Sequence, residues 1–192
     1  MTIQELGKEI ALGLVNTGIE GGFGSVSCST AGDYPSGGCQ QVEGGRFDEL
    51  INDIPGGSKF AGRTYNDISS AGELDELSAL LDSSEGQAAQ LEILQRDTET
   101  YAQRAIDCGL TDARCVIYAG MWGPTSTYIM GLFIENRIGR DIAANLQNLN
   151  QVFYDEYATA AGCGDYATGY QNRAQMTYEY VSELDLSAYG YE

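Results

Sequence analysis

A glutamate followed by glycines is the feature of this sequence best suited to chemistry. Glu20 follows an amphipathic segment and precedes Gly21, Gly22 and Gly24. An ionisable carboxyl therefore lies between the end of a predicted helix and a flexible, glycine-rich segment. A polar loop, Ser-Gly-Gly-Cys-Gln-Gln-Val, follows at residues 36–42. This arrangement suits glycan cleavage, which needs an acid held in a fixed direction and backbone that a sugar can approach. The alternative interpretation is that Glu20 is a solvated surface charge.

The composition excludes several other kinds of site. The chain has 192 residues, no His and a formal net charge of −18. Without His there can be no Ser-His-Asp, Cys-His or His-zinc site, so acid–base chemistry must fall to Asp, Glu or Tyr. The negative charge argues against nucleic acid as a partner, because no basic stripe is present to neutralise phosphates. We expect no cofactor and no metal, and the charge itself is most simply explained by solubility.

The chain carries no signal for a membrane. It lacks an apolar run of roughly 18 residues, which a membrane-spanning helix would need. The N-terminal segment mixes acidic with apolar residues and has no basic stretch. We therefore expect no membrane span, and a secretory signal peptide that is either absent or already removed.

Five cysteines leave the disulfide pattern open. Cys28 and Cys39 flank the polar loop and could form a disulfide, whereas we expect Cys108, Cys115 and Cys163 to be buried free thiols. No Cys-x-x-Cys motif occurs, which argues against a zinc ribbon or a thioredoxin-like site.

The spacing of apolar residues predicts a mainly α chain. Thr2 and Glu5 form a capping box that opens a helix running to about Gly18. Residues 21–45 are rich in Gly and Ser, which predicts an ordered loop or a small β excursion. Further helices are expected at residues 46–54, 73–82 with Ser70 as the cap, 85–108, from Thr111 onward, 140–161 and 166–184. No long linker interrupts them, so we expect a single compact domain over residues 1–192.

Several segments resemble the lysozyme-like superfamily. Glu20 followed by residues 36–42 looks like the glutamate plus Ser-x-Gly-x-x-Gln pattern of goose-type lysozymes and soluble lytic transglycosylases. Residues 59–68 are similar to segments in lysozyme-like domains of phage endolysins, and residues 177–181 resemble the Thr-x-x-Tyr-Val helix of the transglycosylases. The segments keep the order of the family and span most of the chain. One difference is Val42, where the endolysin domains carry Trp.

The resemblance implies a lysozyme-like helical domain with a small irregular or β-containing N-terminal region, and it implies roles for particular residues. Glu20 would be the general acid. Asp33 would be a second carboxylate, because it lies where the endolysin relatives carry an Asp-containing turn; alternatively it caps its own loop. Glu43 is a third carboxyl within reach.

Three polar or aromatic residues would bind substrate. Gln41 would hydrogen-bond a sugar or position Glu20, or else satisfy backbone groups of its loop. Tyr65 and Tyr180 would line the groove, or else pack in the core.

The function implied is an endolysin-type N-acetylmuramidase that cleaves peptidoglycan glycan strands. Such an enzyme would be made in a host cytoplasm without a signal peptide and would reach the wall through a pore or on a virion. A separate wall-binding domain or partner chain would target it. Three alternatives stay open: a lytic transglycosylase that uses Glu20 alone, a non-catalytic lysozyme-like virion or carbohydrate-binding module, and an unrelated acidic helical interaction protein.

Overall fold

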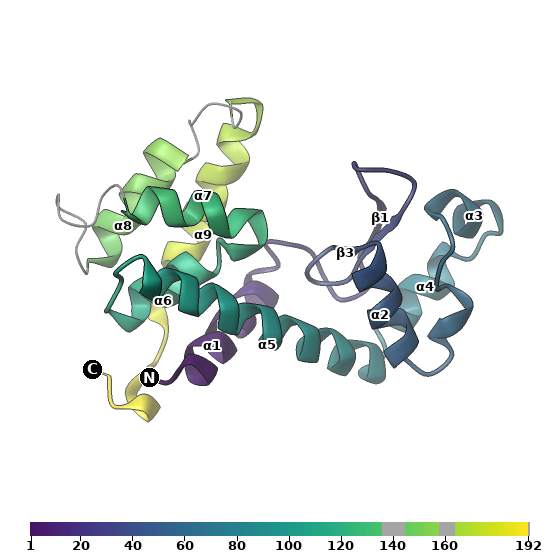
Figure 1. Cartoon of the computed structure of the whole chain (residues 1–192), viewed down its shortest axis with the longest axis horizontal. Coiled ribbons are helices and arrows are strands. Elements are labelled where there is room, and N and C mark those ends of the chain that lie inside the picture. The colour runs from purple at the N-terminus through teal and green to yellow at the C-terminus, as the bar shows by residue number, and fades with distance from the viewer. Residues whose placement is uncertain (136–144, 158–163, 192) are drawn as a thin grey trace. The chain divides into compact units, whose positions relative to one another are not determined.

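The structure is a computed structural model and describes residues 1–135, 145–157 and 164–191 (Figure 1). The described chain is mainly helical, with a small three-stranded antiparallel sheet near the N-terminus, which confirms the prediction of a mainly α chain with a small β-containing region. It divides into two units. Residues 18–94 form the sheet unit, and residues 1–17 with 95–192 form the helical unit. The expectation of one lysozyme-like domain stays a prediction.

The sheet lies in the Gly- and Ser-rich segment, as expected. Its strands are β1 (Val26–Cys28), β2 (Pro35–Gly37) and β3 (Val42–Glu43), in that order. Strand β1 pairs antiparallel with β2, with Val26 opposite Gly37, and β2 pairs with β3, with Ser36 opposite Glu43. Strands this short need packing against other elements to be stable.

Helices supply that packing within the sheet unit. They are α2 (Gly45–Asp53), the 3-10 helix η1 (Gly57–Lys59), α3 (Tyr65–Ser70), α4 (Leu74–Leu81) and the first part of α5 (Ser84–Asp107). Figure 1 shows α2 next to β3, and the two elements are in contact. Their shared core consists of Val42, Phe47, Leu50, Ile51, Ile54, Phe60, Ile68, Leu77, Leu81 and Ile93. Burial of this apolar set is the main force that holds the short strands in place.

Two helix starts differ from the prediction. Ser70 is not the cap of the helix at residues 74–81, because it belongs to α3, a short helix that the sequence did not predict. Glu73 takes the N-cap position of α4 without a side-chain hydrogen bond. The helix predicted from Thr111 onward is α6 (Ala113–Gly120), which begins two residues later. Its cap is Asp112, which accepts a hydrogen bond from the Cys115 N–H at 3.0 Å.

The helical unit is built around α1 (Ile3–Thr17), which packs on α6 and on α9 (Ala167–Glu183). The predicted capping box is confirmed: the Thr2 N–H donates to Glu5 at 2.6 Å, and the Glu5 N–H donates to Thr2 Oγ1 at 3.2 Å. At the other end of the chain, the 3-10 helix η4 (Ser187–Tyr189) is tied to α1. The Tyr189 hydroxyl donates to Glu9 at 2.6 Å, and this hydrogen bond raises the pKa of Tyr189 to about 12.

The remaining helices of this unit are α7 (Gly123–Glu135), α8 (Leu146–Val152), the π-helix η2 (Phe153–Tyr157) and the 3-10 helix η3 (Gly164–Tyr166). Helix α7 was not predicted; its backbone is extended at Ser126, whose hydroxyl caps the following turn through the Ile129 N–H. The predicted helix at residues 140–161 is described only at 145–157, where it is helical from Leu146; its other residues lie outside the described part of the chain.

An aromatic cluster forms the core of the helical unit. Trp122 is fully buried, with the ring centroid of Phe153 at 4.8 Å and that of Tyr157 at 4.7 Å. Trp122 is therefore a core residue. Within the residues that the structure describes, no helix is long and apolar enough to cross a membrane.

The proposed Cys28–Cys39 disulfide is wrong, because both residues are free thiols. Cys28 is exposed on β1, opposite Pro35, and its thiol faces the Gly32 carbonyl at 3.7 Å. Cys39 lies beyond the far end of β2 and is buried. The sheet register thus separates two residues that are close in sequence. Cys108 and Cys115 are buried free thiols, as predicted, and Cys163 lies outside the described residues.

Candidate functional site

Glu20 lies in a glycine turn of the sheet unit, three residues beyond the end of α1 at Thr17. The turn is closed by the Gly21 N–H, which donates to the Gly18 carbonyl at 3.1 Å, and by the Gly22 N–H, which donates to Ser25 Oγ at 2.9 Å. Gly21 has a φ of 122°, a backbone conformation that favours glycine. Glu20 is partly buried in this turn. The backbone around Glu20 is therefore held by hydrogen bonds of this turn, although Glu20 lies beyond the end of α1.

The turn lies against the side chain of Gln41. A Cβ placed on Gly21 would be 3.1 Å from Gln41 Nε2, so the backbone next to Glu20 approaches this amide closely. The Gln41 Oε1 accepts hydrogen bonds from Ser27 Oγ at 3.0 Å and from Ser36 Oγ at 3.1 Å. Gln41 itself has a φ of 53°, a left-handed conformation that few residues other than glycine adopt. The serine hydroxyls hold this strained residue in a defined direction.

These contacts bring together part of the predicted site. The Glu20 turn, Gln41 and the serines of β1 and β2 form one polar cluster. The Gln41 Nε2 donates to the Gly38 carbonyl at 3.4 Å, so the amide also supports its own loop. A sugar-binding role for Gln41 stays a prediction.

Asp33 has a different position and a visible structural role. It lies at the tip of the β1–β2 hairpin, at the opposite end from Gly21. Its carboxylate accepts a hydrogen bond from the Asn66 N–H at 3.0 Å, and its carbonyl accepts one from the Tyr65 N–H at 3.3 Å. Asp33 therefore caps the first turn of α3, together with Thr64, which accepts from the Asp67 N–H. The cap serves a helix distant in sequence and not the loop of Asp33 itself.

Glu43 is the third carboxyl that the sequence singled out. It is exposed at the end of β3 and accepts a hydrogen bond from Ser29 Oγ at 2.7 Å. Ser29 in turn accepts the Ala31 N–H at 3.1 Å, so Glu43 stabilises the start of the hairpin loop.

The two predicted groove tyrosines belong to different units. Tyr65 is partly buried at the first position of α3 in the sheet unit. Tyr180 is partly buried on α9 in the helical unit, where its ring lies against Gly13 of α1. Burial raises the pKa of Tyr180. Their role as groove residues stays a prediction.

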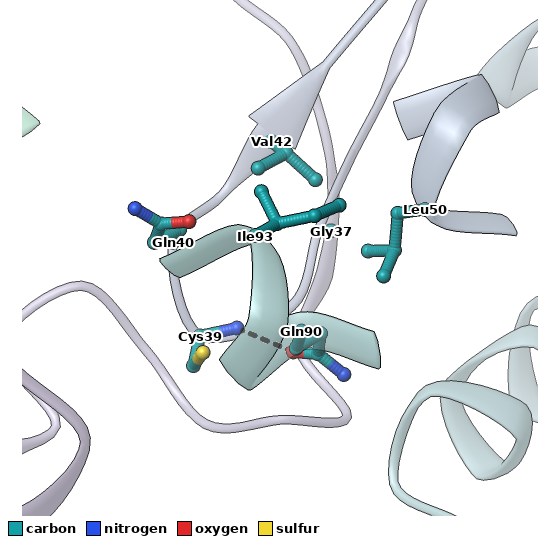
Figure 2. A pocket seen from close by; sticks show the side chains of 7 residues that line it. All are labelled: Gly37, Cys39, Gln40, Val42, Leu50, Gln90 and Ile93. Carbon is teal, nitrogen blue, oxygen red and sulfur yellow. Dashed lines mark hydrogen bonds between the residues drawn. The ribbon is translucent and has the colours of Figure 1, made fainter. Parts of the chain in front are cut away.

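A buried glutamine holds the loop that follows β2, and the sequence analysis did not find it. Figure 2 shows Gln90 of α5 reaching the backbone of Cys39, whose N–H donates to Gln90 Oε1 at 2.9 Å. The Gln90 Nε2 donates to the Leu81 carbonyl at 2.8 Å, so one side chain ties the loop to the end of α4. Beside it lies a cavity of about 10 Å³, room for about one water molecule, lined also by Gly37, Gln40, Val42, Leu50 and Ile93. This space is too small for a sugar.

The sheet unit has a second and larger cavity, of about 170 Å³, between the hairpin tip and the start of α2. It is lined by residues such as Tyr34 and Asp48, which the sequence analysis did not assign to a site. The available signal was the pair Gly44-Gly45 at a helix start, a place where backbone is accessible.

Among the described residues, no group of three or more Cys, Asp or Glu side chains could hold a metal ion. In comparisons with known proteins, no family model, no curated protein and no solved structure matches this chain.

Proposed function

We propose that this chain is a peptidoglycan-degrading glycosidase with a lysozyme-like fold, in which Glu20 is the general acid. The observation that carries the proposal is the contact between the Glu20 turn and the Gln41 side chain, which Ser27 and Ser36 hold in place. This contact brings the backbone next to Glu20, a partly buried residue, close to the oriented Gln41 amide and the two serine hydroxyls. The order of elements supports it as well: a helix, the glutamate, a small sheet, and then helices.

In the proposed reaction, the Glu20 carboxyl donates its proton to the glycosidic oxygen as the bond from that oxygen to the sugar C1 breaks. The developing positive charge on the sugar is then captured at C1 by an oxygen nucleophile. A water molecule gives hydrolysis, and the Glu20 carboxylate or a second carboxylate takes its proton. With His absent, a carboxyl is the natural group for the first step.

The structural role of Asp33 favours a second candidate function, that of a lytic transglycosylase. Since the Asp33 carboxylate accepts the Asn66 N–H at the start of α3, it already has a structural task. A transglycosylase needs no second carboxylate: the substrate's own hydroxyl attacks C1 to close an anhydro ring, and the Glu20 carboxylate takes the hydroxyl proton. The released fragments distinguish the two reactions by mass spectrometry, because anhydro ends are lighter by one water than hydrolysed ends.

Glu20→Gln tests the catalytic proposal. The amide keeps the shape of the side chain but cannot donate a proton as an acid, so we expect the rate of peptidoglycan cleavage to fall by about 100-fold or more. The measurement is the loss of turbidity of purified Gram-positive peptidoglycan.

Asp53→Asn is the matched control, because it removes an exposed carboxyl from the same unit, at the end of α2, and should keep most of the activity. Circular dichroism of both variants checks that they are folded. Equal rates of cleavage for Glu20→Gln and the wild type would refute Glu20 as the general acid. No cleavage by either protein would leave a non-catalytic carbohydrate-binding module as the interpretation.

A further inference from the structure

The larger cavity of the sheet unit has an apolar floor and a polar rim. Pro35 of β2 and Phe47 of α2 are buried and form the floor, whereas Asp48 and Thr64 carry polar groups on the rim. Its volume of about 170 Å³ far exceeds the space needed for a single water molecule. A cavity that combines apolar surface with a few convergent polar groups has the general character of a small-ligand site.

Tyr34 provides an aromatic surface at the edge of this cavity. Tyr34 is 52% exposed and lines the cavity. The ring rests on Gly32, because a Cβ placed there would be 2.8 Å from Tyr34 Cε2. The hairpin backbone thus supports the ring from one side. A supported, exposed aromatic ring is preorganised to stack on an apolar face of a ligand.

Gly44 and Gly45, at the start of α2, also line this cavity. The N-cap residue is Gly44, which has no side chain to cap the helix, and the space around Gly45 is open. The first N–H groups of a helix have no partner inside the helix and can donate to a ligand. Gly45 is exposed, and neither residue has a side chain that could cover the backbone here.

Asp48 and Thr64 supply the complementary groups. Asp48 Oδ1 accepts the Gly62 N–H at 2.8 Å, which orients the carboxylate and leaves its second oxygen able to accept from a ligand. Thr64 Oγ1 accepts the Asp67 N–H at 3.1 Å, so the hydroxyl hydrogen can be donated. The cavity therefore offers both donors and acceptors around an apolar floor.

The electrostatics favour a neutral ligand. Arg63 lines the cavity, but its guanidinium is paired with Glu73 at 2.6 Å, so its charge is already compensated. Asp48 is an acid, and the whole chain has a net charge of −18. An anionic ligand would be repelled, whereas a neutral ligand with hydroxyl groups would not.

We propose that this cavity is an additional glycan subsite that binds one neutral N-acetylated pyranose ring, an inference that rests on the function proposed above. The sugar stacks on Tyr34, a ring hydroxyl donates to Asp48, and a carbonyl or hydroxyl oxygen accepts from the Gly45 backbone N–H. Such a subsite would hold part of a glycan strand by contacts separate from the Glu20 turn.

The test is a titration of the full chain, labelled with ¹⁵N, with a tetramer of N-acetylglucosamine. We use Glu20→Gln so that the probe is not cleaved, and follow the backbone amide signals of Gly44, Gly45 and Gly62. The expected result is a saturable shift of these signals. Tyr34→Ala removes the stacking surface and should raise the dissociation constant of the tetramer by about 5- to 10-fold.

Tyr166→Ala is the matched control, because Tyr166 is 69% exposed in the helical unit and should leave the binding unchanged. The inference is overturned if these glycine signals do not shift, or if Tyr34→Ala binds the probe as tightly as its parent. The turbidity assay separates the two proposals. Wall cleavage by the wild type without glycine shifts refutes only the subsite. Saturable shifts without wall cleavage refute only the catalytic proposal and leave the cavity as a glycan-binding site.

Discussion

At the scale of single residues, Asp33 is where structural and catalytic roles can be separated. Its carboxylate caps α3 by accepting the Asn66 N–H at 3.0 Å. Asp33→Ala removes this acceptor and should lower the free energy of unfolding by about 1 kcal/mol. Asp33→Asn keeps an acceptor oxygen and should stay within about 0.5 kcal/mol of the wild type. Urea denaturation of both variants measures these differences.

The activity of the same variants then decides the role of Asp33. If it only caps α3, Asp33→Asn should cleave peptidoglycan at a rate near that of the wild type, as a transglycosylase with Glu20 alone would. If it is a second catalytic carboxylate, Asp33→Asn should lose most of its activity while its stability is unchanged. Loss of activity at full stability would therefore contradict the capping role as the main function of this residue.

Residues that act locally were the ones that the sequence could predict. The reciprocal hydrogen bonds of Thr2 and Glu5 depend on three-residue spacing, and the structure confirms them. By contrast, Asp33 caps α3 by accepting the Asn66 N–H, and the two residues are far apart in the sequence. A pattern of neighbouring residues cannot predict such a contact. The Cys28–Cys39 disulfide failed for a related reason, since short spacing does not determine where the sheet register places two side chains.

At the scale of elements, Gln90 connects the loop after β2 to two helices. Its amide accepts the Cys39 N–H and donates to the Leu81 carbonyl, and the side chain is 4% exposed. Gln90→Leu would leave both backbone groups without these partners in a buried place. We expect the free energy of unfolding to fall by about 2–3 kcal/mol. Chemical denaturation measures this value, and amide hydrogen exchange at residues 38–41 shows whether the loop opens.

Gln95→Leu is the control for this prediction, because Gln95 is exposed on the same helix. It should change the stability by no more than about 0.5 kcal/mol. If Gln90→Leu lost no more stability than this control, the two hydrogen bonds of Gln90 would not be needed to hold the loop. Gly38 provides independent support: its φ is 79°, and a Cβ there would be 2.4 Å from Gln90 Oε1, so the loop and the glutamine fit only when this residue is glycine.

The long amphipathic helices could be predicted, whereas the short ones could not. The predicted helix at residues 85–108 is α5, because its apolar residues recur at helical spacing over many turns. Helix α3 has only six residues and depends on caps from Thr64 and Asp33. Helix α7 contains Gly123, Pro124 and an extended residue at Ser126, so neither propensity nor spacing indicated it. For the candidate site, the sequence located Glu20 and Gln41 but not the cavity beside Tyr34, which only packing creates.

At the scale of the whole molecule, buried thiols predict how stability depends on pH. Burial raises the pKa of Cys39, in the sheet unit, to about 11 and that of Cys115, in the helical unit, to about 12, from an ordinary value of 9.0. A thiol with a raised pKa in the folded state holds its proton more tightly there than in the unfolded chain. Its contribution to stability is therefore fully present below pH 9 and is lost as the pH rises through the folded pKa.

We therefore expect the urea midpoint to be nearly constant between about pH 7 and pH 8.5 and to fall steeply above about pH 9. Other ionising groups and the growing negative charge also contribute to this fall, so the thiol effect must be isolated by comparison. Cys115→Ala should show a shallower decline above pH 9 than the wild type, because the group that ionises on unfolding is gone. Cys28→Ala, which removes an exposed thiol, should keep the wild-type slope. Equal slopes for the two variants would show that ionisation of the buried Cys115 thiol does not control alkaline unfolding.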